Sequence, residues 1–235
     1  MKKINLNETS PRRKFLQTIA AGSAALGVAS VITPFQQLQA EPMPGLSLDN
    51  PTPDEWFNQI KGKHRMVFDV TQPHEIFPFA WPKVFLLTNA ATGTPEKESS
   101  VVVILRHSAI GYALPDAIWA KYKLGEVFKA DDPKTKSPSL RNPFWKPAAG
   151  DFSVPGVGPV AIGINELQES GVMFCVCNMA ITVYSAVIAG MNNLSKDDVQ
   201  KELTAAVLPG IQLVPSGVWA VGRAQEHGCG YCFAG

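Results

Sequence analysis

Residues 101–108 of the chain read VVVILRHS, in which five apolar residues are followed at once by three polar ones. Four of the five apolar residues are β-branched, and such residues favour extended backbone. A run that is apolar at every position is typical of a strand covered on both faces, as in parallel sheets. The stretch therefore predicts a central strand of an α/β domain, with Arg106, His107 and Ser108 at its carboxyl end.

The rest of the chain alternates between short apolar segments and longer amphipathic ones. Further strands are expected at residues 66–70, 172–177, 210–214 and 230–233, and helices at 54–61, 74–89, 109–122, 163–170, 179–189, 197–206 and 217–225. This alternation predicts a mainly parallel sheet with helices on both faces. We expect a single three-layer α/β domain with about five mostly parallel strands.

The composition is that of a folded domain. The chain has 235 residues, of which 46% are hydrophobic, and its formal net charge is +1. That apolar content and low charge exclude a mainly disordered chain, and four Cys are too few for a disulfide scaffold. Because the sequence lacks a stripe rich in Lys and Arg, we do not expect it to bind nucleic acid.

The first forty residues have the order of a secretory signal. A paired arginine in SPRRKFLQ (residues 10–17) precedes the uncharged stretch 18–33, and Ala40 offers a small residue for cleavage. The pattern resembles twin-arginine (Tat) signals, which predicts contact with the Tat translocase, export to the periplasm and no membrane span after cleavage. An uncleaved anchor is the alternative.

Prolines mark two further parts of the chain. Residues 41–63, which contain four prolines, are expected to form an N-terminal arm that leads to the α/β domain at 64–235. Five more prolines lie between residues 125 and 158 and predict a Pro-rich insertion or long loop. Phe144 and Trp145 predict that this insertion packs against the domain.

Cys177 is the first candidate for a functional residue. Chemistry in parallel α/β sheets gathers at the carboxyl edge, and Cys177 ends a strand just before a helix, whose first N–H groups favour a thiolate. A thiolate is the nucleophile in persulfide transfer and thiol exchange. The alternative is that Cys177 is a small buried apolar residue. Cys175 leaves the strand on the same face, and we interpret it as core packing.

His107 and the C-terminal residues are the other candidates. At the same sheet edge, His107 would act as an acid, a base or a metal ligand, or would only begin a helix. Cys229 and Cys232 form a C-x-x-C pair beside His227, a spacing that suits a redox dithiol or half of a metal site. A structural 229–232 disulfide is the alternative in an exported protein.

Two short segments resemble a known family. Residues 171–180 (GVMFCVCNMA) and 214–218 (VPSGV) resemble the DsrE/DsrF-like family, and the resemblance extends over residues 64–233. It implies a small α/β domain with a five-stranded, mostly parallel sheet, and a chain that forms oligomers. It also implies a sulfur carrier whose strand-end cysteine accepts persulfide sulfur, and Cys177 matches that position.

These observations lead to one hypothesis and two alternatives. The hypothesis is an exported DsrE-like protein that handles sulfur or thiol redox through Cys177, with a cysteine-bound persulfide. One alternative is a non-enzymatic protein that binds a metal or a metal-centred cofactor. The other is a structural subunit of an exported complex, with the Pro-rich insertion at the interface. We expect a homo-oligomer or an exported partner protein, and the sequence does not decide whether the chain is an enzyme.

Overall fold

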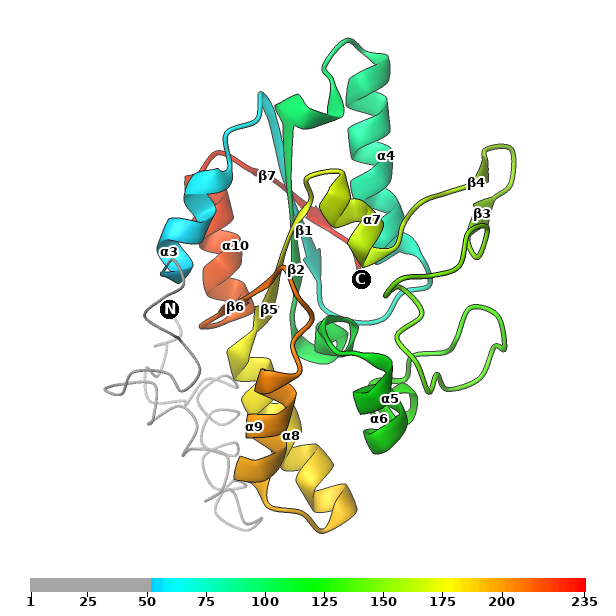
Figure 1. Cartoon of the computed structure of the whole chain (residues 1–235). Coiled ribbons are helices and arrows are strands. Elements are labelled where there is room, and N and C mark those ends of the chain that lie inside the picture. The colour runs from blue at the N-terminus through cyan, green and yellow to red at the C-terminus, as the bar shows by residue number, and fades with distance from the viewer. Residues whose placement is uncertain (1–51) are drawn as a thin grey trace, which may run out of the picture. The chain divides into compact units, whose positions relative to one another are not determined.

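A computed structural model describes residues 52–235 (Figure 1). The predicted signal peptide at 1–40 and residues 41–51 of the expected arm lie outside the described residues. Residues 52–235 belong to one compact unit, Met43–Gly235.

Five strands form one sheet, and all of its pairings are parallel. The strands are β1 (His64–Val70), β2 (Ser99–Leu105), β5 (Met173–Cys177), β6 (Ile211–Val214) and β7 (Gly230–Phe233), in the order β6-β5-β2-β1-β7. In this register Val103 lies between Phe68 and Phe174. The predicted fold class is therefore confirmed, and the VVVILRHS stretch supplies the central strand.

Helices cover both faces of this sheet (Figure 1). The α-helices are α3 (Pro53–Trp56), α4 (Phe77–Ala91), α5 (Asp116–Tyr122), α6 (Leu124–Phe128), α7 (Ile164–Glu169), α8 (Asn178–Asn192), α9 (Lys196–Ala205) and α10 (Gly217–Glu226). The 3-10 helices of the described part of the chain are η2 (Phe57–Gln59), η3 (Glu96–Glu98) and η4 (His107–Ala113), and a small hairpin pairs β3 (Ser153–Val154) with β4 (Gly158–Pro159). None of the helices within residues 52–235 is both long and apolar enough to cross a membrane.

The residues of β2 alternate between two buried clusters. Val101, Val103 and Leu105 belong to the larger cluster, which includes side chains of α4, α5, α7, α8 and α9. Val102 and Ile104 point the other way and pack in a second cluster with small residues of α10 and aromatic residues of α3 and η2. All five are almost completely buried, because a strand covered on both faces has no side exposed to water.

The Pro-rich insertion packs against the domain, as Phe144 predicts. The Phe144 ring stacks on Phe152 with centroids 4.9 Å apart and lies 4.2 Å from the Phe79 ring of α4. Asn142 is 1% exposed, and its Nδ2 donates to the carbonyl oxygens of Tyr112 and Leu114 at 2.8 and 2.9 Å. These bonds tie a segment without regular secondary structure to the end of η4.

Several helices differ from their predicted bounds, and the helix expected at 74–89 spans Phe77–Ala91. The expected helix over 109–122 is divided into η4 and α5, and Pro115 is the N-cap of α5. Proline lacks a backbone N–H group, so it disrupts hydrogen bonding less at the start of a helix than in its interior. The helix expected to end before Gly190 runs on to Asn192, where Asn193 adopts a left-handed φ of 52° and ends it. The segment 54–61 forms only α3 and η2.

Candidate functional site

Residues from several strands meet at the carboxyl edge of the sheet. Because the strands are parallel, their ends lie side by side along one edge. This edge holds Asp69 near the end of β1, Arg106 just after β2, Cys177 at the end of β5 and Ser216 just after β6. It is the edge on which the sequence predicts chemistry.

Cys177 is both the last residue of β5 and the N-cap of α8. Its Sγ accepts a hydrogen bond from the backbone N–H of Ala180 at 3.2 Å. The backbone N–H group of Met179 donates to the carbonyl oxygen of Pro215 at 3.2 Å, which ties the first turn of α8 to the loop after β6. The sulfur therefore occupies the place of the usual capping oxygen, at the positive end of a 15-residue helix.

Cys177 is buried, with 6% of the residue exposed. An N–H donor and a helix N-terminus favour a negative charge on sulfur. Cys175, two residues earlier, is fully buried in the cluster under α10, and burial raises the pKa of its thiol well above the usual value. The prediction that Cys175 is core packing is confirmed. The expectation that Cys175 and Cys177 leave the strand on the same face is wrong, because Cys177 packs in the opposite cluster, where α8 begins.

Arg106 and Asp69 form a bidentate ion pair at the same edge of the sheet. Arg106 Nε lies 2.6 Å from Asp69 Oδ1, and Nη2 lies 2.8 Å from Oδ2. The Tyr231 hydroxyl of β7 donates to the same Oδ2 at 2.8 Å. The hydrogen bond to Asp69 raises the pKa of Arg106, and attraction to Asp69, Tyr231 and Cys177 adds to the shift. Burial, then the Asp69 hydrogen bond, raises the pKa of Tyr231.

Gly217 leaves room for the Arg106 side chain at the start of α10. A Cβ atom at Gly217 would lie 2.5 Å from Cβ and 2.6 Å from Cδ of Arg106. No real pair of carbon atoms packs that closely. The absence of a side chain at this position lets α10 begin directly over the arginine.

His107 lies at the same edge, on the exposed surface. It has a left-handed φ of 49°, its Nδ1 lies 3.3 Å from Ser108 Oγ, and its ring meets the Tyr184 ring of α8 at 5.8 Å. His107 begins η4, so the helix-start interpretation is correct. An acid or base role for His107 stays a prediction.

The structure separates the residues of the C-terminal motif. Cys229 precedes β7 and is buried in the cluster under α10, and burial raises the pKa of its thiol to about 11. Cys232 pairs in register with Phe68 and packs against the opposite cluster, because strand residues alternate in direction. His227 follows α10 and stacks on Phe57 with ring centroids 6.3 Å apart.

Cys229, Cys232 and His227 therefore do not form the predicted ligand group. In residues 52–235 no three His, Cys, Asp or Glu side chains are grouped so that they could hold a metal ion. The four cysteines are free thiols, so the alternative of a 229–232 disulfide is not formed either. The donors in the described part of the chain do not fit a metal site.

Asp69 and Tyr231 belong to the site without having been predicted from the sequence. Asp69 had a visible signal, since an acidic residue inside the apolar segment MVFDV requires a buried partner. Tyr231 had none, because it reaches Asp69 across 162 positions of sequence.

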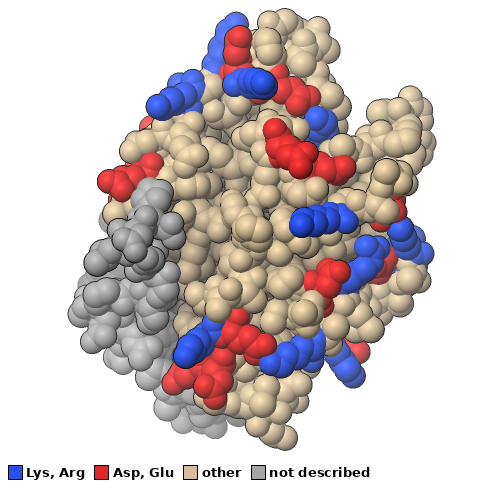
Figure 2. Space-filling view, viewed as in Figure 1, with Lys and Arg blue, Asp and Glu red and all other residues tan. Residues whose placement is uncertain are grey.

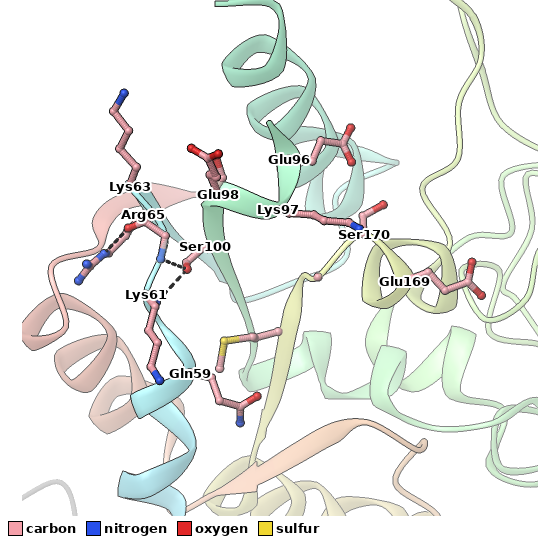
Figure 3. Close-up of a pocket in the computed structure, with 14 residues that line it drawn as sticks. Gln59, Lys61, Lys63, Arg65, Glu96, Lys97, Glu98, Ser100, Glu169 and Ser170 are labelled. Atoms are coloured by element: carbon pink, nitrogen blue, oxygen red, sulfur yellow. Dashed lines mark hydrogen bonds between the residues drawn. The ribbon is translucent and has the colours of Figure 1, made fainter. Parts of the chain in front are cut away.

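A cleft of about 990 Å³ lies at the opposite, amino edge of the sheet (Figure 3). It is lined by the starts of β1, β2 and β5, with both basic residues (Lys61, Lys63, Arg65, Lys97) and acidic ones (Glu96, Glu98, Glu169). Ser100 Oγ accepts hydrogen bonds from the backbone N–H groups of Lys61 and Gly62 at 3.2 and 2.7 Å. The lining residues include no cysteine or histidine, so this cleft holds none of the candidate residues named from the sequence.

One face of the domain carries charges of both signs. Figure 2 shows basic and acidic side chains interspersed over the viewed face, with no broad basic patch among its described residues.

The comparisons with known proteins identify no family. No protein-family model matches the chain, and no curated protein matches its sequence. Among solved structures, the chain is similar to a protein of unknown function from Methanobacterium thermoautotrophicum, at 16% sequence identity and a TM-score of 0.36. The match covers 73% of this chain and 99% of that one.

Proposed function

We propose that the chain is an exported DsrE-like protein that accepts and passes on a sulfur atom at Cys177. The observation that carries the proposal is the N-cap position of Cys177, where the Ala180 N–H donates to Sγ at the positive end of α8. The resemblance of residues 171–180 to the DsrE/DsrF-like family supports the same residue.

The transfer needs no external oxidant or reductant. The Cys177 thiolate attacks the terminal sulfur of a low-molecular-weight or protein persulfide, R–S–SH. A sulfur–sulfur bond forms to Cys177 while the donor's sulfur–sulfur bond breaks, and its electron pair leaves with the donor thiolate, R–S⁻. The product is Cys177–S–SH, which passes its outer sulfur to an acceptor thiolate by the same exchange.

The other cysteines are poorer carriers for physical reasons. Cys175 is fully buried, and burial raises the thiol pKa of both Cys229 and Cys232. A thiol with a raised pKa supplies less thiolate near neutral pH. Cys177 alone among the four caps a helix through its sulfur.

The proposal includes export and self-association. The paired Arg12 and Arg13 direct the chain to the Tat pathway, so replacing both with lysine should keep it out of the periplasmic fraction. The 15 residues of α8 include no charged side chain, and Val183, Val187 and Met191 expose about half of their surface. A second copy covers this face in a homo-oligomer.

The test is transfer of labelled sulfur to the reduced protein. A small persulfide donor carrying radioactive outer sulfur is mixed with wild type, with Cys177→Ser and with the matched control Cys232→Ser, and the label that stays with protein is counted after gel filtration. The proposal predicts one label per chain in wild type and Cys232→Ser, lost on reduction, and none in Cys177→Ser. Equal labelling of all three proteins, or of none, contradicts it.

A further inference from the structure

The cleft at the amino edge of the sheet carries an excess of positive charge. Residues 52–235 as a whole have 16 basic and 17 acidic side chains, whereas the lining of the cleft has four basic and three acidic ones. One of these acids, Glu96, is already bound by Lys83 of α4, which lies outside the lining, at 3.1 and 3.3 Å. The lining therefore sets four cations against two carboxylates that no basic residue neutralises.

Arg65 is a fixed cation at the edge of this cleft. Its Nε donates to the carbonyl oxygen of Gly62 at 2.6 Å, and its Nη1 donates to that of His227 at 2.7 Å. Carbonyl oxygens hold the guanidinium in place without cancelling its charge, because they carry no net charge of their own. Arg65 thus adds to the positive potential of the cleft.

The three lysines of the lining are exposed and make no ion pair within the described part of the chain. They are Lys61, Lys63 and Lys97. In the view of Figure 3, Lys61 lies on the side of Gln59 and Lys97 on the side of Ser170. Unpaired ammonium groups therefore stand on two different walls of the cleft.

Backbone contacts hold the cleft open in one shape. Ser100 at the start of β2 binds the N–H groups of Lys61 and Gly62 through its hydroxyl oxygen. A Cβ atom at Gly62 would lie 2.4 Å from the backbone nitrogen of Ser100, so the two segments approach this closely only because residue 62 is glycine. A preformed cleft of this kind is typical of ligand sites.

Ser99 supplies an unpaired polar atom to the same lining. Its Oγ is buried and has no hydrogen-bond partner among the described residues. A buried hydroxyl group without a partner is costly. An acceptor oxygen of a ligand would satisfy it, which favours a ligand rich in oxygen atoms.

Size and charge together define the class of ligand. The cleft has a volume of about 990 Å³, which suits an organic molecule and is far larger than an inorganic oxyanion needs. Cations on two walls call for negative groups that a spacer keeps apart. Carboxylates on a carbon or peptide chain have this arrangement and form charge-assisted hydrogen bonds with lysine.

We propose that the amino-edge cleft binds an organic polycarboxylate, either a free acid or the acidic side chains of a peptide. The site is separate from that of the proposed function. Met173 lines the cleft at the start of β5, and Cys177 ends the same strand, about 13 Å away at roughly 3.3 Å per residue. Cys177→Ser should therefore bind the ligand as wild type does, and either proposal can fail without the other.

Isothermal titration calorimetry at low salt tests the site with three probes: citrate, a tetraglutamate peptide and inorganic sulfate. We expect at least one of the two organic probes to bind once per chain, and sulfate to bind at least about 10-fold more weakly. Tighter binding of the peptide identifies a peptide ligand, and tighter binding of citrate identifies a free acid. Failure of both organic probes to bind, or sulfate binding as tight as theirs, overturns the proposal.

Variants of the lining locate the bound probe. Lys61→Gln with Lys97→Gln should weaken binding by about 5- to 10-fold, and Ser99→Ala should weaken it by about 2- to 5-fold. Glu98→Gln removes a repelling carboxylate and should strengthen binding. Lys201→Gln is the matched control, since Lys201 is an exposed lysine of α9 outside the lining. Unchanged binding in the double variant, or an equal loss in Lys201→Gln, overturns the proposal.

Discussion

Replacing Asn142 with alanine tests whether the Pro-rich insertion is an integral part of the domain. The Asn142 side chain donates to the carbonyl oxygens of Tyr112 and Leu114, and its Oδ1 accepts from the Phe144 N–H at 3.1 Å. Alanine leaves three backbone groups without this partner in a site where Asn142 is 1% exposed. At about 1 kcal/mol for each hydrogen bond, the expected loss in the free energy of unfolding is about 3 kcal/mol.

Asn142→Asp sharpens this prediction through its pH dependence. A carboxylate would face two carbonyl oxygens, and burial would raise its pKa in the folded state above the unfolded value of about 3.9. The destabilisation is therefore full above the folded pKa and is relieved as the pH falls through it, because the protonated acid can donate one hydrogen bond. Asn142→Asp should be less stable than Asn142→Ala near pH 7 and recover relative to it at about pH 4 to 5.

Urea unfolding followed by circular dichroism measures these differences. Asn165→Ala is the matched control, since Asn165 makes one bond to the backbone of the same insertion, at an exposed site. Its loss should stay below about 1 kcal/mol. If Asn142→Ala and Asn165→Ala are equally stable, the insertion is not held to η4 in the way described.

Three further predictions concern Cys177, Cys229 and α8. Cys177→Ala removes the cap of α8 and should lower the free energy of unfolding in urea by about 1 kcal/mol. Cys177→Ser keeps a capping atom and should lower it by less. Equal losses in the two variants argue against the cap. Burial raises the pKa of Cys229 to about 11. As the pH rises from about 9 to 11, the free energy of unfolding of wild type should therefore fall by roughly 2–3 kcal/mol relative to that of Cys229→Ala. Parallel plots of unfolding free energy against pH for the two proteins would contradict this. Val187→Lys should reduce the mass seen by light scattering to that of one chain, whereas Val157→Lys, at another exposed valine, should not; an unchanged mass in Val187→Lys removes α8 from the interface.

The fold was largely predictable because its strands are local signals. The VVVILRHS segment, apolar at its first five positions, identified a strand buried on both faces, and β2 ends at Leu105 as its polar successors indicate. The same reasoning placed Cys177 at a strand end and Cys175 in the core. Helix ends were less predictable, since Asn193 rather than Gly190 supplies the left-handed residue after α8.

The candidate site was only partly predictable because it depends on contacts between distant segments. Asp69 and Tyr231 meet only when β7 pairs with β1, and no local pattern reports that pairing. The C-x-x-C spacing wrongly predicted that Cys229 and Cys232 share one site, for a related reason. A strand begins at Gly230, and its alternation turns Cys232 away from Cys229.

Intact-mass spectrometry with peptide mapping decides whether Cys177 carries sulfur. The protein is purified without reductant, exposed to a small persulfide donor and digested, so that each of its four cysteines is assigned. The proposed function predicts one added sulfur atom, removed by reductant and located on Cys177. An added sulfur atom on another cysteine, or an unmodified Cys177 in protein whose fold is intact, would contradict it.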